Sequence, residues 1–156
     1  MARFKRGVNP VVLIIHIALM FFGLLVSNAA GLDAIELSGG LLTGGKLSPS
    51  RFNINTEEKE AYFKEAAQAF KTALDVPLIL VGGIRSLDVA EGLFKSGTAD
   101  YFSMSRPLIR EPDLVNRWQS GDRSPARCLS DNLCFRPGMM GKGIYCVTEE
   151  RMETQQ

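Results

Sequence analysis

Two segments rich in glycine and arginine carry the residues best suited to bind a phosphate group. Residues 81–86 read Val-Gly-Gly-Ile-Arg-Ser, and residues 103–112 read Ser-Met-Ser-Arg-Pro-Leu-Ile-Arg-Glu-Pro. Glycine lets a backbone approach a ligand closely, and the first N–H groups of a helix attract anions. Arginine adds a permanent charge and a forked set of donors that match a phosphate. The pattern predicts one phosphate site formed by both segments.

Each segment follows a predicted strand. Residues 77–81 form an apolar run closed by Gly82 and Gly83, which predicts a strand buried on both faces. Ser86 is expected to cap the next helix and Gly97 to end it. The two glycines let this backbone approach a ligand closely, and the first free N–H groups of the helix after Ser86 form a candidate anion site.

Residues 99–104 repeat the strand pattern, and Ser105 and Arg106 follow where the previous unit has its two glycines. Pro112 suits the first turn of another helix, which Gly121 would terminate. Ser105 and Arg106 complete the candidate phosphate site. Arg85 and Arg110 are weaker candidates, because either can be a solvated or ion-paired surface group.

A third unit precedes these two. Residues 32–38 predict a strand, and a loop rich in Gly, Ser and Pro follows from residue 41 to about residue 53. Asn55 and Glu58 have the spacing of a capping box. One apolar helical face is then expected from Phe63, Ala66, Ala67, Phe70 and Leu74. Three strand–helix units in succession predict parallel strands joined by right-handed crossovers.

Residues 31–40, 81–86 and 99–114 resemble the last three strand–helix units of the old yellow enzyme family. These NADH:flavin oxidoreductases are eight-stranded barrels that bind FMN, and the resemblance extends over about residues 30–146. It implies an α/β fold, namely the C-terminal part of a (β/α)8 TIM barrel with about three βα units. Dihydroorotate dehydrogenase-type barrels share the Gly-Gly strand end, but the run at residues 105–114 and the cysteine-containing tail favour the old yellow enzyme family.

The resemblance also implies a cofactor site. In the family the FMN phosphate lies between the ends of the seventh and eighth strands, which correspond here to Gly82, Gly83, Ile84, Ser105 and Arg106; Ser105 replaces a common glycine. The parent reaction passes a hydride from NADH or NADPH through FMN to an activated alkene or enoyl substrate. The family's catalytic residues lie upstream of the matched segment, so we assign none. The chain is expected to be either an enzyme truncated to its FMN-phosphate half or a non-catalytic phosphate- or FMN-binding remnant.

The C-terminal tail resembles the cluster-binding tail of the dienoyl-CoA reductase branch of this family. That branch supplies four cysteines to an iron–sulfur cluster. This chain has Cys128, Cys134 and Cys146, and Asp131 stands where the second cysteine is expected. Oxygen is a poorer ligand than thiolate for such clusters. We therefore expect free thiols rather than an intact cluster on these three cysteines.

The N-terminal segment has a different character. Basic residues precede an apolar run at residues 11–26, and Ser-Asn-Ala follows it at residues 27–29. This arrangement is typical of a signal peptide, and it is also close to the length of a membrane span. A buried helix or out-of-family sequence joined to a truncated gene explains it equally. His16, the single histidine, lies within the run without a partner motif, and no catalytic role is expected for it.

Composition limits the remaining choices. The chain has 156 residues, 46% of them hydrophobic, and a net charge of +1, which argues against nucleic-acid binding. We divide it into an apolar segment (1–29), a partial FMN-binding barrel (30–124) and a cysteine-containing tail (125–156). A partial barrel has open strand edges, so we expect self-association or a complementary half-barrel. The family suggests a cytoplasmic protein, whereas a functional segment at residues 11–27 would make it membrane-associated or exported.

Overall fold

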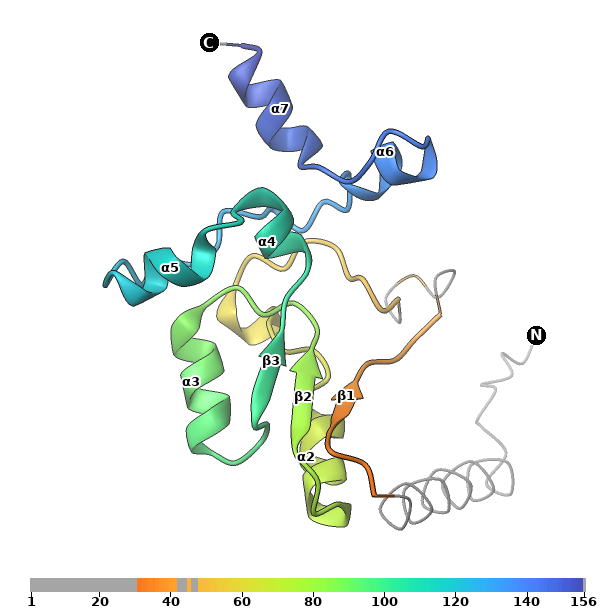
Figure 1. The fold of residues 1–156 in the computed structure, drawn as a ribbon, viewed down its shortest axis with the longest axis vertical. Coiled ribbons are helices and arrows are strands. Elements are labelled where there is room, and N and C mark those ends of the chain that lie inside the picture. Colours follow the sequence, from red (N-terminus) through yellow and green to blue (C-terminus); the bar gives the residue numbers. More distant parts are fainter. Residues whose placement is uncertain (1–30, 42–44, 46–47, 156) are drawn as a thin grey trace, which may run out of the picture.

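A three-stranded parallel sheet lies at the centre of the fold, with strand order β1-β2-β3 (Figure 1). The computed structural model describes residues 31–41, 45 and 48–155. The strands are β1 (Ile35–Leu37), β2 (Leu78–Val81) and β3 (Tyr101–Ser103). Glu36 pairs with Ile79, and Leu80 pairs with Phe102. The predicted α/β class and the three consecutive parallel strands are confirmed, and the arrangement is compatible with part of a barrel.

Helices connect and follow the strands. Between β1 and β2 lie a 3-10 turn, η2 (Glu57–Lys59), and the helix α2 (Lys64–Ala73). The helix α3 (Leu87–Lys95) connects β2 to β3. After β3 come α4 (Arg106–Arg110), α5 (Leu114–Gln119), α6 (Phe135–Met139) and α7 (Val147–Glu153). Figure 1 shows α4 and the tail helices α6 and α7 at the carboxyl end of the strands.

The core lies on one face of the sheet. Leu78 and Leu80 of β2 are buried in one cluster with Ala67 of α2 and Ala90 of α3. The alternate residues of β2, Ile79 among them, are only half-buried. The prediction that this strand is buried on both faces is therefore wrong for one face, because the described helices cover only the side of Leu78 and Leu80.

The predicted capping box does not form. Residues Glu57–Lys59 make a separate 3-10 turn, and Ala61 has a φ of +47°, which breaks any continuous helix. Asn55 instead accepts a hydrogen bond from Lys59 Nζ at 2.6 Å. The helix α2 begins at Lys64, later than predicted. Of its predicted apolar face, Ala67 and Leu74 are buried, Phe63 and Phe70 pack against the core, and Ala66 is exposed.

The ends of the later helices agree better with the sequence. Gly97 has a φ of +69° directly after the C-cap of α3, and Gly121 has a φ of +100° just past the C-cap of α5. Pro112 precedes the N-cap of α5 instead of lying in its first turn. The short helix α4, which contains Arg106, was not expected from the sequence.

Two predictions on the N-terminal segment lie outside the described residues, namely the apolar helix with its membrane span at 11–27 and the absence of a catalytic role for His16. In the described part of the chain, no helix is long and apolar enough to cross a membrane. The boundary between barrel and tail at residue 124 stays a prediction.

Candidate functional site

A cavity of about 280 Å³ lies at the carboxyl ends of β2 and β3, and it gathers the predicted phosphate site. All five candidate residues line it, and they come from the two predicted segments: Gly82, Gly83, Ile84, Ser105 and Arg106. Drug-sized ligands need roughly 300–1,000 Å³. This cavity therefore has room for a phosphate and part of its attached chain, but not for a whole flavin.

The backbone after β2 turns in a way that only glycine adopts easily. Gly82 has a φ of +123° and Gly83 a φ of +75°. Among the described residues, the N–H groups of Gly83, Ile84, Ser105 and Arg106 donate no hydrogen bond to a protein acceptor. Unpaired backbone donors that line one cavity are the groups that a phosphate requires.

An aromatic pair packs against the same glycines. A Cβ atom on Gly83 would lie 2.8 Å from the Tyr62 ring, and one on Gly82 would lie 2.9 Å from the rings of Tyr62 and Phe63. Tyr62 Oη donates to the carbonyl of Pro49 at 2.7 Å, which fixes the ring in place. The glycines are therefore needed for packing as well as for any ligand. No sequence pattern pointed to Tyr62.

Arg106 is buried, with 8% of its surface exposed, and its guanidinium is anchored at one nitrogen. Nη1 donates to the carbonyl of Arg51 at 2.9 Å and to Asn132 Oδ1 at 2.5 Å. Nε and Nη2 of Arg106 donate no hydrogen bond to a described residue, and neither atom is fully shielded from solvent. Two of its nitrogens thus remain open to a ligand.

The two N–H groups directly before α3 bind a carboxylate of the chain itself. Glu60 is 3% exposed, and its Oε2 accepts from the N–H groups of Arg85 at 2.8 Å and Ser86 at 2.9 Å. The Ser86 hydroxyl donates to Glu60 Oε1 at 2.6 Å, so Ser86 holds the N-cap position without capping the helix through its side chain. A carboxylate of the chain thus lies just before α3, and the anion site expected on the first N–H groups of that helix stays a prediction.

The two weaker arginine candidates have structural partners. Arg85 donates from Nη1 to the carbonyl of Ile54 and from Nη2 to that of Ala126 at 2.6 Å. Arg110 forms an ion pair with Glu149 of α7 at 2.7 Å, and its side chain is buried. Both arginines therefore hold neighbouring segments of the chain together.

The tail cysteines carry free thiols, of which Cys128 and Cys134 are buried and Cys146 is half-buried. Burial raises the pKa of the Cys134 thiol, and the neighbouring Cys128 raises it further. Burial also tends to raise the pKa of Asp131, but hydrogen bonds from Thr148 Oγ1 at 2.6 Å and the Leu133 N–H at 3.1 Å outweigh it and lower that pKa. Within the described ranges, no three His, Cys, Asp or Glu side chains are grouped to hold a metal ion.

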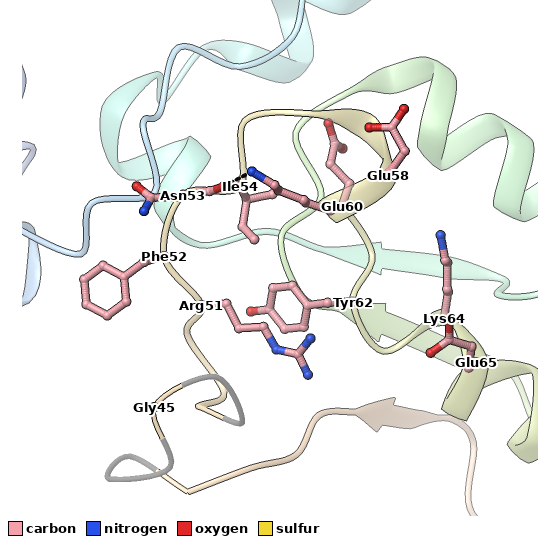
Figure 2. Close-up of a pocket in the computed structure, with 11 residues that line it drawn as sticks. Gly45, Arg51, Phe52, Asn53, Ile54, Glu58, Glu60, Tyr62, Lys64 and Glu65 are labelled. Atoms are coloured by element: carbon pink, nitrogen blue, oxygen red, sulfur yellow. Dashed lines mark hydrogen bonds between the residues drawn. The ribbon is translucent and has the colours of Figure 1, made fainter.

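A second cavity of about 560 Å³ lies on the other side of Tyr62. Figure 2 shows Arg51 lying along the Tyr62 ring, and its guanidinium carbon is 4.4 Å from the ring centroid. Tyr62 lines both cavities, so its ring forms part of the wall between them. Sequence reasoning did not identify this cavity, which is lined by the loop before η2, by η2 itself and by the start of α2.

Comparisons with known proteins show that part of the chain is similar to flavin oxidoreductases. No family model matches the chain. It is 33% identical over 94 residues to the 4,4'-dithiodibutanoate disulfide reductase of Rhodococcus erythropolis, which covers 60% of this chain and 23% of that protein. It is 36% identical over 94 residues to the NADH-dependent flavin oxidoreductase iccE of Talaromyces variabilis, which covers 54% of this chain and 22% of that protein.

A third relative carries no reference to flavin in its name. The imidazole glycerol phosphate synthase subunit HisF of Thermosynechococcus vestitus is 37% identical over 70 residues, or 45% of this chain and 22% of that protein. The chain thus spans about a quarter of the length of the curated relatives it matches. Over the matched segment, it is similar to NADH-dependent flavin oxidoreductases, in agreement with the resemblance noted from its motifs.

Proposed function

We propose that this chain is the phosphate-binding part of an FMN-dependent oxidoreductase of the old yellow enzyme type. The observation that carries the proposal is the convergence of Gly82, Gly83, Ile84, Ser105 and Arg106 on one cavity. When bound, FMN would accept a hydride from NADH or NADPH and pass it to an activated alkene or enoyl substrate. The residues of this chain bind and orient the phosphate end of the cofactor.

The donor set suits a phosphate. The open N–H groups of Gly83 and Ile84 come from the end of β2, and those of Ser105 and Arg106 come from the end of β3. Nε and Nη2 of Arg106 add two charged donors from one side chain. Hydrogen bonds from a guanidinium to a phosphate are about twice as strong as those between neutral groups. The names of the flavin oxidoreductase relatives favour FMN as the phosphate-bearing ligand.

The open edge beside β3 supports a partner proposal. β3 pairs only with β2 among the described strands, and the exposed side chains of Phe94, Tyr101 and Val115 line a groove of about 360 Å³ next to it. Unpaired edges and exposed apolar grooves favour association. We propose that a complementary half-barrel, or a second copy of this chain, covers this edge and completes a (β/α)8 barrel.

Binding of FMN and riboflavin tests the proposal, because the two flavins differ only in the phosphate. Flavin fluorescence titration of the full chain should give a lower Kd for FMN than for riboflavin. Arg106→Met should raise the FMN Kd about 10- to 100-fold, since a hydrogen bond to a charged group contributes about 1.5–3 kcal/mol. Its riboflavin Kd should stay the same, and Arg136→Met on the exposed surface of α6 is the matched control. Equal wild-type affinities for the two flavins would overturn the proposal.

A non-catalytic phosphate-binding module is the second candidate. The similarity to HisF, whose name includes a glycerol phosphate, favours a general phosphate site over one specific to flavin. NADH oxidation by the FMN-loaded chain separates the two candidates. Tight FMN binding without any NADH oxidation, alone or after mixing with a complementary half-barrel, would favour the module.

A further inference from the structure

An amide side chain in the tail holds the arginine of the cavity. Asn132 Oδ1 accepts from Arg106 Nη1 at 2.5 Å and from Ser50 Oγ at 3.0 Å, and Asn132 Nδ2 donates to the Ser50 carbonyl at 2.9 Å. Asn132 lies 26 residues from Arg106 and 82 residues from Ser50 in the sequence. One side chain therefore connects the tail, the loop before η2 and the start of α4.

The backbone around Asn132 is shaped for this contact. Asn132 has a φ of +59° and Ser130 a φ of +53°, and asparagine is among the few residues that adopt this left-handed region readily. The Ser130 carbonyl accepts from the Asn53 N–H at 3.1 Å, which fixes the loop against the tail. The Arg51 carbonyl of the same loop is the second acceptor for Arg106 Nη1. Both anchors therefore use Nη1 and leave the rest of the guanidinium free.

The charge of Arg106 is left uncompensated. Among the described residues, Arg106 forms no ion pair, whereas Arg110 and Arg127 pair with Glu149, and Arg117 pairs with Glu111. Both acceptors of the Arg106 guanidinium are neutral oxygens. A carboxylate at the position of the Asn132 amide would orient the arginine equally well, but it would cancel the charge that attracts an anion.

We propose that Asn132 is a positioning residue that aims Arg106 at a phosphate-bearing ligand without neutralising it. This inference rests on the proposed function of the cavity. It predicts that the neutrality of Asn132, as well as its hydrogen bonds, matters for ligand binding. For the orientation of Arg106 alone, only an acceptor is needed at this position, and an aspartate also provides one.

The test compares Asn132→Asp with the wild type in FMN and riboflavin titrations. The substitution keeps the acceptor oxygen and a residue that tolerates positive φ, but it loses the Nδ2 donor to the Ser50 carbonyl. The new ion pair with Arg106 should offset part of that loss, so the urea midpoint of unfolding should fall by less than it does in a variant that loses the acceptor as well. The FMN Kd should rise about tenfold or more, and the riboflavin Kd should stay within twofold. Gln119→Glu on the exposed surface of α5 adds the same charge away from the cavity, and it should change neither Kd.

A second variant, Asn132→Ser, loses the reach to Arg106 without adding charge. It should raise the FMN Kd by less than Asn132→Asp does and should lower the unfolding midpoint by more. An FMN Kd within twofold of wild type for Asn132→Asp, in a chain that prefers FMN to riboflavin, would overturn the inference alone. A wild-type chain with no preference for FMN would overturn the proposed function and, with it, this role of Asn132.

Discussion

Replacement of Glu60 by alanine should destabilise the protein strongly, although the residue lies in a loop between η2 and α2. Its carboxylate accepts three hydrogen bonds, from the Arg85 N–H, the Ser86 N–H and the Ser86 hydroxyl, at 2.8, 2.9 and 2.6 Å. Glu60 and Ser86 are both buried. Water cannot readily replace the lost acceptor in Glu60→Ala, so the donors would stay unsatisfied.

The size of the effect follows from those three donors. A buried donor without a partner costs about 1–3 kcal/mol, so two N–H groups and one hydroxyl give on the order of 3 kcal/mol at the lower end. Loss of a negative charge at the start of α3 adds about 0.3–1 kcal/mol. Glu60→Gln retains one acceptor oxygen, and it should cost only about 1 kcal/mol.

Urea unfolding followed by tryptophan fluorescence measures this loss of stability, because Trp118 is the single tryptophan. It is buried in a second hydrophobic cluster, together with Leu114 and Ala126. With a urea dependence of about 2 kcal/mol per molar, Glu60→Ala should lower the midpoint by roughly 1.5 M. Glu57→Ala, an exposed neighbour in η2, is the matched control and should stay within about 0.5 kcal/mol of wild type. Equal midpoints for Glu60→Ala and Glu57→Ala would refute the role of Glu60 as the buried acceptor for the N–H groups of Arg85 and Ser86 and for the Ser86 hydroxyl.

Two further substitutions test other parts of the fold. Gly83→Ala should lower the free energy of unfolding by at least about 1 kcal/mol, because the alanine would have to adopt a positive φ and its Cβ would lie 2.8 Å from the Tyr62 ring. Gly92→Ala in the middle of α3, where a Cβ meets no neighbour, should be neutral or stabilising. Similar unfolding midpoints for the two variants would contradict the packing argument. Asp100→Asn should cost up to about 1 kcal/mol at pH 7, since hydrogen bonds from Lys71 and from the Leu78 N–H hold the pKa of Asp100 below its usual value. A lowered folded-state pKa means that this stabilisation is present above about pH 4 and is lost as the pH falls through the folded value, so urea midpoints of variant and wild type should converge in acid. A difference that persists unchanged at pH 3 would contradict the role of the ionised carboxylate.

The sequence predicts those parts of the fold that depend on neighbours in the chain. The apolar runs before Gly82 and before Ser105 become β2 and β3, and the glycines Gly97 and Gly121 lie just past the ends of the helices they were expected to terminate. Each of these features follows from local hydrophobicity or from the positive φ that glycine allows. The two segments converge on one cavity because parallel strands bring their carboxyl ends to the same edge.

The features that the sequence does not predict depend on distant partners. Asn55 and Glu58 have the spacing of a capping box, but the helix begins later. The carboxylate that binds backbone N–H groups belongs instead to Glu60, and it binds those just before a different helix, α3, across 26 residues of chain. Asn132 likewise binds Arg106 of the cavity from a tail in which only the cysteines and Asp131 stood out in the sequence. Periodicity and motif spacing carry no information about such contacts, because they describe only residues close in sequence.

The two glycines after β2 need a more careful interpretation than their motif suggests. Tyr62 and Phe63 pack so closely on Gly82 and Gly83 that packing alone requires glycine at both positions. The glycines by themselves therefore do not distinguish a ligand site from a tightly packed turn. The open N–H groups of Gly83 and Ile84 do, because a turn built only for packing gains nothing from unpaired donors. Together with an arginine that is held by neutral oxygens alone, they are the stronger argument that this edge of the sheet binds an anion.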